Sequence, residues 1–161
     1  MEQKVVLVSV DGLRPEATLA CAHPFYRNMQ ATSAYTLHGR SINPAVTLPC
    51  HTSMFYGVGA ERHGITINQW VPQVRPIRSV VDAAHDAGGK TAMCYTWDFL
   101  REMAAHGKVD YTFHYAKLRT FEGEMLADRE VTRMACQFVQ AYAPDFLFLY
   151  VSATDWSGHK C

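Results

Sequence analysis

The chain has 161 residues, of which 48% are hydrophobic and 19% charged, as expected for one globular domain with a buried core. Its fifteen basic and fifteen acidic residues balance, so no overall charge attracts a nucleic acid polymer or an anionic membrane surface. No apolar run reaches the roughly 18 residues that a membrane-spanning helix needs. We therefore expect a single domain, residues 1–161, with no membrane or nucleic acid partner.

The predicted elements alternate between apolar, β-branched runs typical of buried strands and apolar residues at helical spacing. In chain order we expect a strand at Lys4–Val10, a strand at Tyr35–Ile42, a short helix at Pro49–Val58, a helix at Ile77–Ala87, strands at Lys90–Tyr95 and Asp110–Tyr115, a helix at Glu124–Tyr142 and a strand at Asp145–Ala153. This alternation predicts an α/β fold with a mostly parallel sheet and helices on both faces. In such folds the active site lies beyond the carboxyl ends of the strands.

The first strand begins almost at the first residue, which leaves no room for a signal peptide. The cysteines are odd in number and scattered, and no C-x-x-C pair occurs among Cys21, Cys50, Cys94, Cys136 and Cys161. Reduced thiols fit this pattern best. We therefore expect a cytoplasmic protein.

Two acidic clusters follow strands and are expected at the same edge of the sheet. Asp11 and Gly12 come directly after the first strand, where an aspartate on a rigid element is well placed to bind a cation. Alone, Asp-Gly is also a frequent turn pair. After the last strand, Asp155 and His159 could offer an oxygen and a nitrogen to one zinc-like ion, or could belong to an ordinary surface loop.

Several candidate nucleophiles stand together in the segment 47–53. Thr47 lies just before the predicted helix, where a threonine either caps the helix or offers its hydroxyl beside the positive helix terminus. A cation held by Asp11 could lower the pKa of that hydroxyl. Cys50 lacks the arginine that would close a phosphate-binding loop, Ser53 lacks the G-x-S-x-G elbow, and His51 alone is more often structural.

Other polar and aromatic residues are open to two interpretations. Asn68, beyond the short helix, could be a turn residue or could donate its amide to a phosphate oxygen. Four aromatic residues could stack on a nucleobase, but such residues near a core more often serve packing: Tyr56, Trp70, Tyr95 and Trp97.

These motifs, in this order, resemble the alkaline phosphatase superfamily, most closely its type I phosphodiesterase/nucleotide pyrophosphatase branch. The resemblance rests on "VSVDG", "NPAVTLPCHTSMFYGVGAERHGI", Asn68 and "LYVSATDWSGH", and it spans most of the chain. It implies that Thr47, in a T-x-P-N-H-like segment with Cys50 in place of the asparagine, is the nucleophile and a metal ligand. It also implies Asp11 as a ligand of the same metal, Asp155 and His159 as ligands of a second metal, and Asn68 with Leu48 as substrate-binding residues.

The resemblance implies a metal-dependent phosphoric ester hydrolase that uses two divalent cations, most plausibly zinc, and a small phosphate ester as substrate. A sulfatase is excluded because Thr47 cannot become formylglycine and because residue 51 is a histidine rather than an arginine. The chain lacks the family's later Asp-His pair and distant histidine, so we expect a truncated alkaline-phosphatase-like domain with an exposed sheet edge. A phosphomonoesterase, a phosphonate hydrolase, a phosphomutase and an inactive fragment remain as alternatives. The oligomeric state is not predicted.

Overall fold

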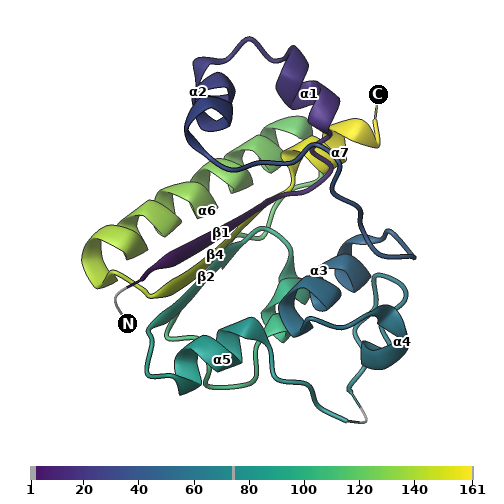
Figure 1. Cartoon of the computed structure of the whole chain (residues 1–161), viewed down its shortest axis with the longest axis vertical. Helices are drawn as coiled ribbons and strands as arrows, with labels where there is room; N and C mark the ends of the chain where they lie inside the picture. Colours follow the sequence, from purple (N-terminus) through teal and green to yellow (C-terminus); the bar gives the residue numbers. More distant parts are fainter. Residues whose placement is uncertain (1–2, 74, 161) are drawn as a thin grey trace.

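A four-stranded parallel sheet forms the centre of the computed structural model, which describes residues 3–73 and 75–160 (Figure 1). The strands are β1 (Val5–Val10), β2 (Thr91–Tyr95), β3 (Tyr111–His114) and β4 (Phe146–Val151), in the order β1-β4-β2-β3. All neighbouring pairs run parallel. The expectation of an α/β fold with a parallel sheet is confirmed.

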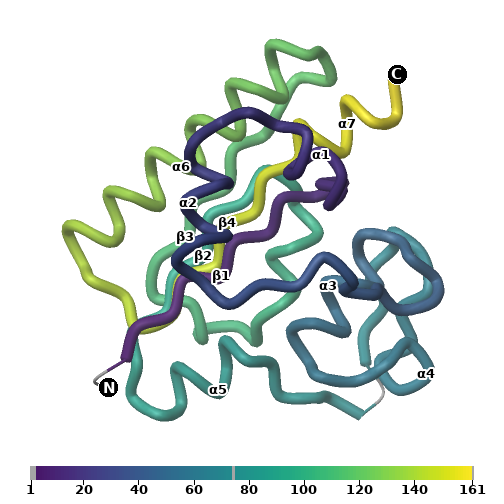
Figure 2. The backbone as a smooth tube through the Cα atoms, turned by 45° about the horizontal axis from the view of Figure 1, so that its top comes forward, coloured from purple at the N-terminus to yellow at the C-terminus, as the bar shows by residue number. Residues whose placement is uncertain are grey.

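Helices cover both faces of this sheet. The helical elements are α1 (Pro15–Ala20), α2 (Pro24–Thr32), α3 (Thr47–Tyr56), α4 (Ala60–His63), α5 (Val80–Asp86), the 3-10 helix η1 (Asp98–Met103), α6 (Phe121–Tyr142) and α7 (Ala153–Gly158). The long helix α6 lies along one face, while α3 and α5 lie on the other (Figures 1 and 2). None of the helices in the described part of the chain is long and apolar enough to cross a membrane.

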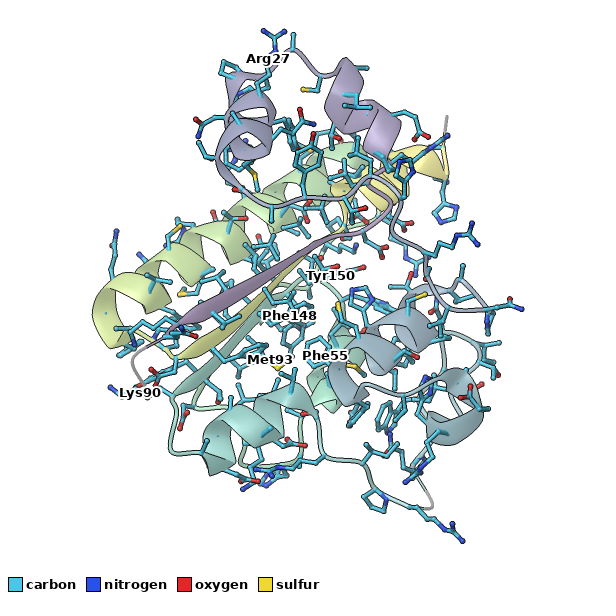
Figure 3. All side chains as sticks on the ribbon, viewed as in Figure 1. Arg27, Phe55, Lys90, Met93, Phe148 and Tyr150 are labelled. Carbon is cyan, nitrogen blue, oxygen red and sulfur yellow. The ribbon has the colours of Figure 1, made fainter. Side chains whose placement is uncertain are left out.

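The core has two layers because side chains of a strand alternate between its faces. On β4, Phe146, Phe148 and Tyr150 point toward α3 and α5 and pack with the apolar side chains of those helices. Leu147 and Leu149 point toward α6 and pack with its buried face. Figure 3 shows Phe55 of α3 and Phe148 close together in the first layer, where their rings meet edge to face at 4.8 Å. This layer places α3 beside the carboxyl end of β4.

Strand β1 forms one edge of the sheet. It pairs with β4, and no other described strand pairs with it. Three of its four valines are about half exposed (Val5 51%, Val6 55%, Val8 50%), whereas β2 is buried throughout. An apolar β-branched run of this kind normally lies inside a parallel sheet. The exposed edge that we expected from the sequence is therefore present at β1.

The prediction of a strand at Tyr35–Ile42 is wrong. This segment is irregular, and none of the backbone hydrogen bonds found among the described residues connects it to a strand. A short run of alternating side chains does not form a strand without a neighbouring strand to share its hydrogen bonds. The segment instead crosses from α2 to α3.

The other predicted elements exist, with shifted boundaries. Helix α3 begins two residues earlier than predicted, at Thr47, and α6 begins three residues earlier, at Phe121. Helix α5 is shorter than predicted because Ser79 and Asp82 form a capping box that sets its start. The helices α1, α2, α4, η1 and α7 were not predicted.

Candidate functional site: a groove at the carboxyl edge of the sheet

The turn after β1 lies directly against the segment after β4. The Asp11 backbone N–H donates to the Val151 carbonyl at 3.0 Å, which continues the β1–β4 pairing by one residue. Gly12 follows with a φ of 70°, and a Cβ at this position would lie 2.6 Å from the Asp155 Cα. Only glycine allows both this backbone conformation and this close approach. The two acidic clusters that the sequence places far apart therefore meet.

Helix α7 carries the second pair of predicted metal ligands. We expected either a ligand pair or a plain loop here, and the segment is a helix in which Asp155 and His159 are one turn apart. The His159 Nε2 lies 3.5 Å from an Asp155 carboxylate oxygen. The start of α7 is held by Asp128 of α6, whose two carboxylate oxygens accept the Ser152 and Ala153 N–H groups at 2.9 Å each.

Thr47 is the first residue of α3 rather than its N-cap. The N-cap is Val46, which makes no side-chain capping bond, so the prediction that Thr47 caps the helix is wrong. Leu48 donates its N–H to the Asn68 side-chain oxygen at 2.9 Å, and Pro49 has no N–H to donate. Among the first three residues of α3, only the Thr47 N–H has no partner within the described part of the chain.

Asn68 and Leu48 are coupled by that hydrogen bond. The oxygen of the Asn68 amide accepts from Leu48, which leaves the two N–H donors of the amide for another partner. The Leu48 side chain is fully buried in the core between α3 and the sheet. Leu48 therefore fixes the orientation of Asn68, and its own role in substrate binding stays a prediction.

The rival nucleophiles on α3 have partners elsewhere. The Cys50 thiol lies 2.9 Å from the Ser41 hydroxyl, and the Ser53 hydroxyl lies 2.9 Å from the His63 Nε2. Both residues line a separate cavity of about 450 Å³ beside β1. His51 also lines this cavity beside β1, and its side chain is only 5% exposed.

The protonation of His51 follows from its partners. Its Nδ1 lies 2.8 Å from the Thr47 carbonyl, which can only accept, so Nδ1 carries the proton. Burial lowers the pKa of His51, which favours the neutral ring. The Nε2, 2.9 Å from the Ser9 hydroxyl, is then the acceptor of that bond.

A groove of about 550 Å³ joins the predicted site residues at the carboxyl edge of the sheet. Of the residues predicted to act in catalysis, substrate binding or metal binding, all except Leu48 line it: Asp11, Thr47, Asn68, Asp155 and His159. They come from the ends of β1 and β4, from the start of α3 and from the loop after α4. Of the four aromatic candidates, only Trp97 lines the groove, and Tyr95 belongs to the core.

Further residues of the groove were missed from the sequence. Lys117 follows β3 and donates to the Glu124 carboxylate at 2.6 Å and to the Ser152 hydroxyl. Glu124 is only 1% exposed, so this is a largely buried ion pair. Arg119, Trp156 and Lys160 complete that side of the groove, and Lys160 lies 5.9 Å above the Trp156 ring. Neither an isolated lysine nor a buried glutamate shows a sequence pattern that distinguishes it from a surface residue.

The Asp11 carboxylate acts on the charge of Asp155 across the groove. Burial is the main cause of the raised pKa of Asp155, and the Asp11 carboxylate raises it further. His159 and Lys117 oppose this effect only in part. Carboxylate oxygens and an imidazole nitrogen are donors of the kind that bind zinc-like ions.

The donors fit part of a metal site and not a whole one. Among residues 3–73 and 75–160, no group of three or more histidine, cysteine, aspartate or glutamate side chains could hold a metal ion. A catalytic zinc ion takes about three protein ligands. Asp155 with His159, and Asp11 with Thr47, would each supply two.

The fold and the groove together define an alkaline-phosphatase-like α/β protein. A family model for type I phosphodiesterase/nucleotide pyrophosphatase matches residues 5–161, and the chain belongs to this family of phosphoric ester hydrolases. Among solved structures, it is similar to the mouse ectonucleotide pyrophosphatase/phosphodiesterase 5, in an inactive threonine-to-alanine variant bound to AMP. That match has a TM-score of 0.78 at 20% sequence identity. No curated protein sequence matches the chain.

The match covers 98% of this chain and 45% of the mouse protein chain. The chain therefore spans less than half the length of that structure. The shared part contains the sheet and the groove.

Proposed function

We propose that this chain carries the nucleophile and half of the metal ligands of a phosphodiesterase or nucleotide pyrophosphatase. Thr47 would be the nucleophile, and a small phosphate ester with a nucleoside group would be the substrate. The observation that carries this proposal is the groove, because it is lined by Thr47, Asn68 and two acidic segments. The mouse protein adds support, since its inactive form carries a threonine-to-alanine change and is in complex with AMP.

We assign these residues roles that fit their positions in the groove. The Thr47 hydroxyl oxygen would attack phosphorus as the bond to the leaving oxygen breaks, and the proton of Thr47 would end on that leaving group. Water would then hydrolyse the phosphoryl-threonine, which releases the phosphate product and restores the Thr47 hydroxyl. The free N–H of Thr47 and the amide NH₂ of Asn68 are two of the groove's donors that could bind a non-bridging phosphate oxygen. Leu48 would contribute indirectly by holding the Asn68 oxygen, which leaves the NH₂ for the phosphate.

Two divalent cations would be held by Asp11 with Thr47 and by Asp155 with His159. The oxygen and nitrogen donors of these residues suit zinc. When bound, they would supply Lewis-acid stabilisation of the attacking and leaving oxygens. The chain itself brings the two acidic segments together through the contact between Gly12 and Asp155. Further ligands beyond these four residues are needed to complete both coordination spheres.

The nucleophile is tested by turnover of a chromogenic phosphodiester with zinc present. We expect Thr47→Ala to abolish turnover and Thr47→Ser to retain part of it, because serine keeps the hydroxyl. A matched control is Thr52→Val, because Thr52 is fully buried on the same helix and its hydroxyl bonds only to the Leu48 carbonyl. Undiminished turnover in Thr47→Ala would exclude Thr47 as the nucleophile.

The substrate class is tested by AMP binding, which does not require turnover. We expect AMP to bind the Thr47→Ala variant in the presence of zinc, and Asn68→Ala to weaken this binding about tenfold through the loss of one charge-assisted hydrogen bond. Comparison of phosphodiester, phosphomonoester and phosphonate substrates then identifies the reaction. A preference for the monoester or the phosphonate would contradict the proposed phosphodiesterase activity.

A further inference from the structure

Tyr150 is bonded to the predicted metal ligand Asp11. The Tyr150 hydroxyl donates to an Asp11 carboxylate oxygen at 2.7 Å, and the side chain of Tyr150 is only 2% exposed. The other oxygen of Asp11 accepts the Gly12 N–H at 3.0 Å. Both oxygens of the carboxylate therefore have a fixed donor. Tyr150 lies on β4 in register with Ser9 on β1, so the bond runs between the two paired strands.

His51 is bonded to the segment that carries the predicted nucleophile. Its ring bridges the Thr47 carbonyl at 2.8 Å and the Ser9 hydroxyl at 2.9 Å. Because Thr47 is on α3 and Ser9 is on β1, His51 connects the start of that helix to the strand that ends at Asp11. No hydrogen bond between Thr47 and Asp11 occurs among the described residues, so their relative position depends on such indirect connections.

The two rings contact each other. His51 meets the Tyr150 ring edge to face, with centroids 5.2 Å apart and an angle of 78° between the planes. Movement of either ring would therefore shift the other, because interiors are packed without room to spare. A phenylalanine would fill the place of Tyr150 equally well, so packing alone does not account for a hydroxyl aimed at Asp11.

We propose that Tyr150 and His51 are positioning residues of this site: Tyr150 orients the Asp11 carboxylate, and His51 fixes the Thr47 segment against β1. The inference rests on the proposed function, since it concerns the same nucleophile and metal ligand. Groups that hydrogen-bond to metal ligands orient them, and their loss typically lowers metal affinity or activity 10- to 100-fold. The chain thus sets the distance between nucleophile and ligand through buried side chains that need not touch the substrate.

The role of Tyr150 is tested by zinc binding to the chain, measured by calorimetry. We expect Tyr150→Phe to weaken, about tenfold, the zinc binding that depends on Asp11. The substitution should cause little loss of thermal stability. Tyr95→Phe is the matched control, because Tyr95 lies opposite Tyr150 on the neighbouring strand β2, is 6% exposed and has no bond to Asp11. Wild-type affinity in Tyr150→Phe would overturn this part of the inference.

The role of His51 is tested by the kinetics of the chromogenic diester and by nitrogen NMR of the ring. We expect His51→Phe, which keeps the ring and removes both hydrogen bonds, to lower kcat about tenfold with little change in KM. His51→Asn keeps a donor near the position of Nδ1 and should recover part of that loss. The NMR spectrum of the wild type should show the proton on Nδ1, and a proton on Nε2 alone would contradict the geometry.

Failure of the inference and failure of the proposed function give different results. If Asp11→Ala removes one of the two zinc-binding events while Tyr150→Phe and His51→Phe behave as the wild type, the proposed metal site stands and the positioning roles are wrong. If Asp11→Ala binds zinc as the wild type does, Asp11 is not a ligand, and both the proposed metal site and the inference fall.

Discussion

Single residues decide whether the two acidic segments of the groove, after β1 and after β4, can lie against each other. Gly12 is the clearest case, because its backbone has a positive φ and its missing side chain allows the approach of Asp155. From the sequence alone, Asp-Gly indicates a turn more readily than a cation ligand. The structure supplies the reason for the glycine itself, which is the contact between two segments far apart in the chain.

Replacement of Gly12 by alanine should therefore destabilise the protein in two ways. The left-handed backbone costs about 1–2 kcal/mol for a residue with a Cβ, and the methyl group must also displace the Asp155 backbone. Gly57→Ala is the matched control, since its φ is 66° and nothing lies within 4 Å of an added Cβ. Urea denaturation should show the larger loss of stability in Gly12→Ala. Equal losses would mean that the close approach carries no cost.

At the scale of elements, much of the fold could be predicted and the ends of elements could not. The apolar runs of β4 and β2 and the periodic face of α6 are strong local patterns, and these elements exist where expected. The segment Tyr35–Ile42 looks like a strand locally, but a strand also needs a neighbour, which local patterns do not reveal. Helix α7 was missed because it spans 6 residues and depends on Asp128, which is distant in sequence.

The residues of the candidate site also fall into those that the sequence predicted and those that it did not. Asp11, Thr47, Asn68, Asp155 and His159 were identified because their motifs resemble a family and lie after predicted strands, and the groove brings them together. Tyr150 was part of a predicted strand, but its sequence position does not reveal that its hydroxyl reaches Asp11. Lys117 and Glu124 were missed for the same reason, since their pairing depends on how α6 packs on the sheet.

Asp128 should control how firmly α7 is held. In Asp128→Ala, two backbone N–H groups at the start of α7 lose their acceptor, which should cost about 1–3 kcal/mol. Hydrogen exchange at Ser152 and Ala153 should accelerate, and zinc binding should weaken with it. Glu130→Gln on α6 removes only an exposed ion pair with Arg133 and is the control. Unchanged exchange at Ser152 and Ala153 in Asp128→Ala would contradict this role.

At the scale of the whole molecule, the two ends of the sheet have different roles. The carboxyl ends of the strands carry the groove, whereas the amino ends are tied together by Asp145, which accepts from the Lys90 N–H at 2.8 Å and from Lys4 at 3.2 Å. The four described cysteines, Cys21, Cys50, Cys94 and Cys136, are free, and Cys161 lies outside the described residues. The cytoplasmic location expected from these thiols stays a prediction.

The amino ends should respond to acid through Asp145. The Lys90 N–H, and after it Lys4, hold the pKa of Asp145 below its usual value of 3.8. A carboxyl whose pKa is lower in the folded state stabilises the fold above its unfolded pKa, and this stabilisation is lost as the pH falls through the folded pKa. The wild type should therefore exceed Asp145→Asn in thermal stability at pH 7, and the difference should shrink below about pH 4.

Melting curves of both proteins between pH 7 and pH 2 measure this convergence. Lys4→Met removes the weaker of the two interactions and leaves the bond from Lys90 in place. It should therefore reduce the difference between neutral and acid stability less than Asp145→Asn does. A stability difference between wild type and Asp145→Asn that stays constant down to pH 2 would show that the charge of Asp145 contributes nothing to joining the strands.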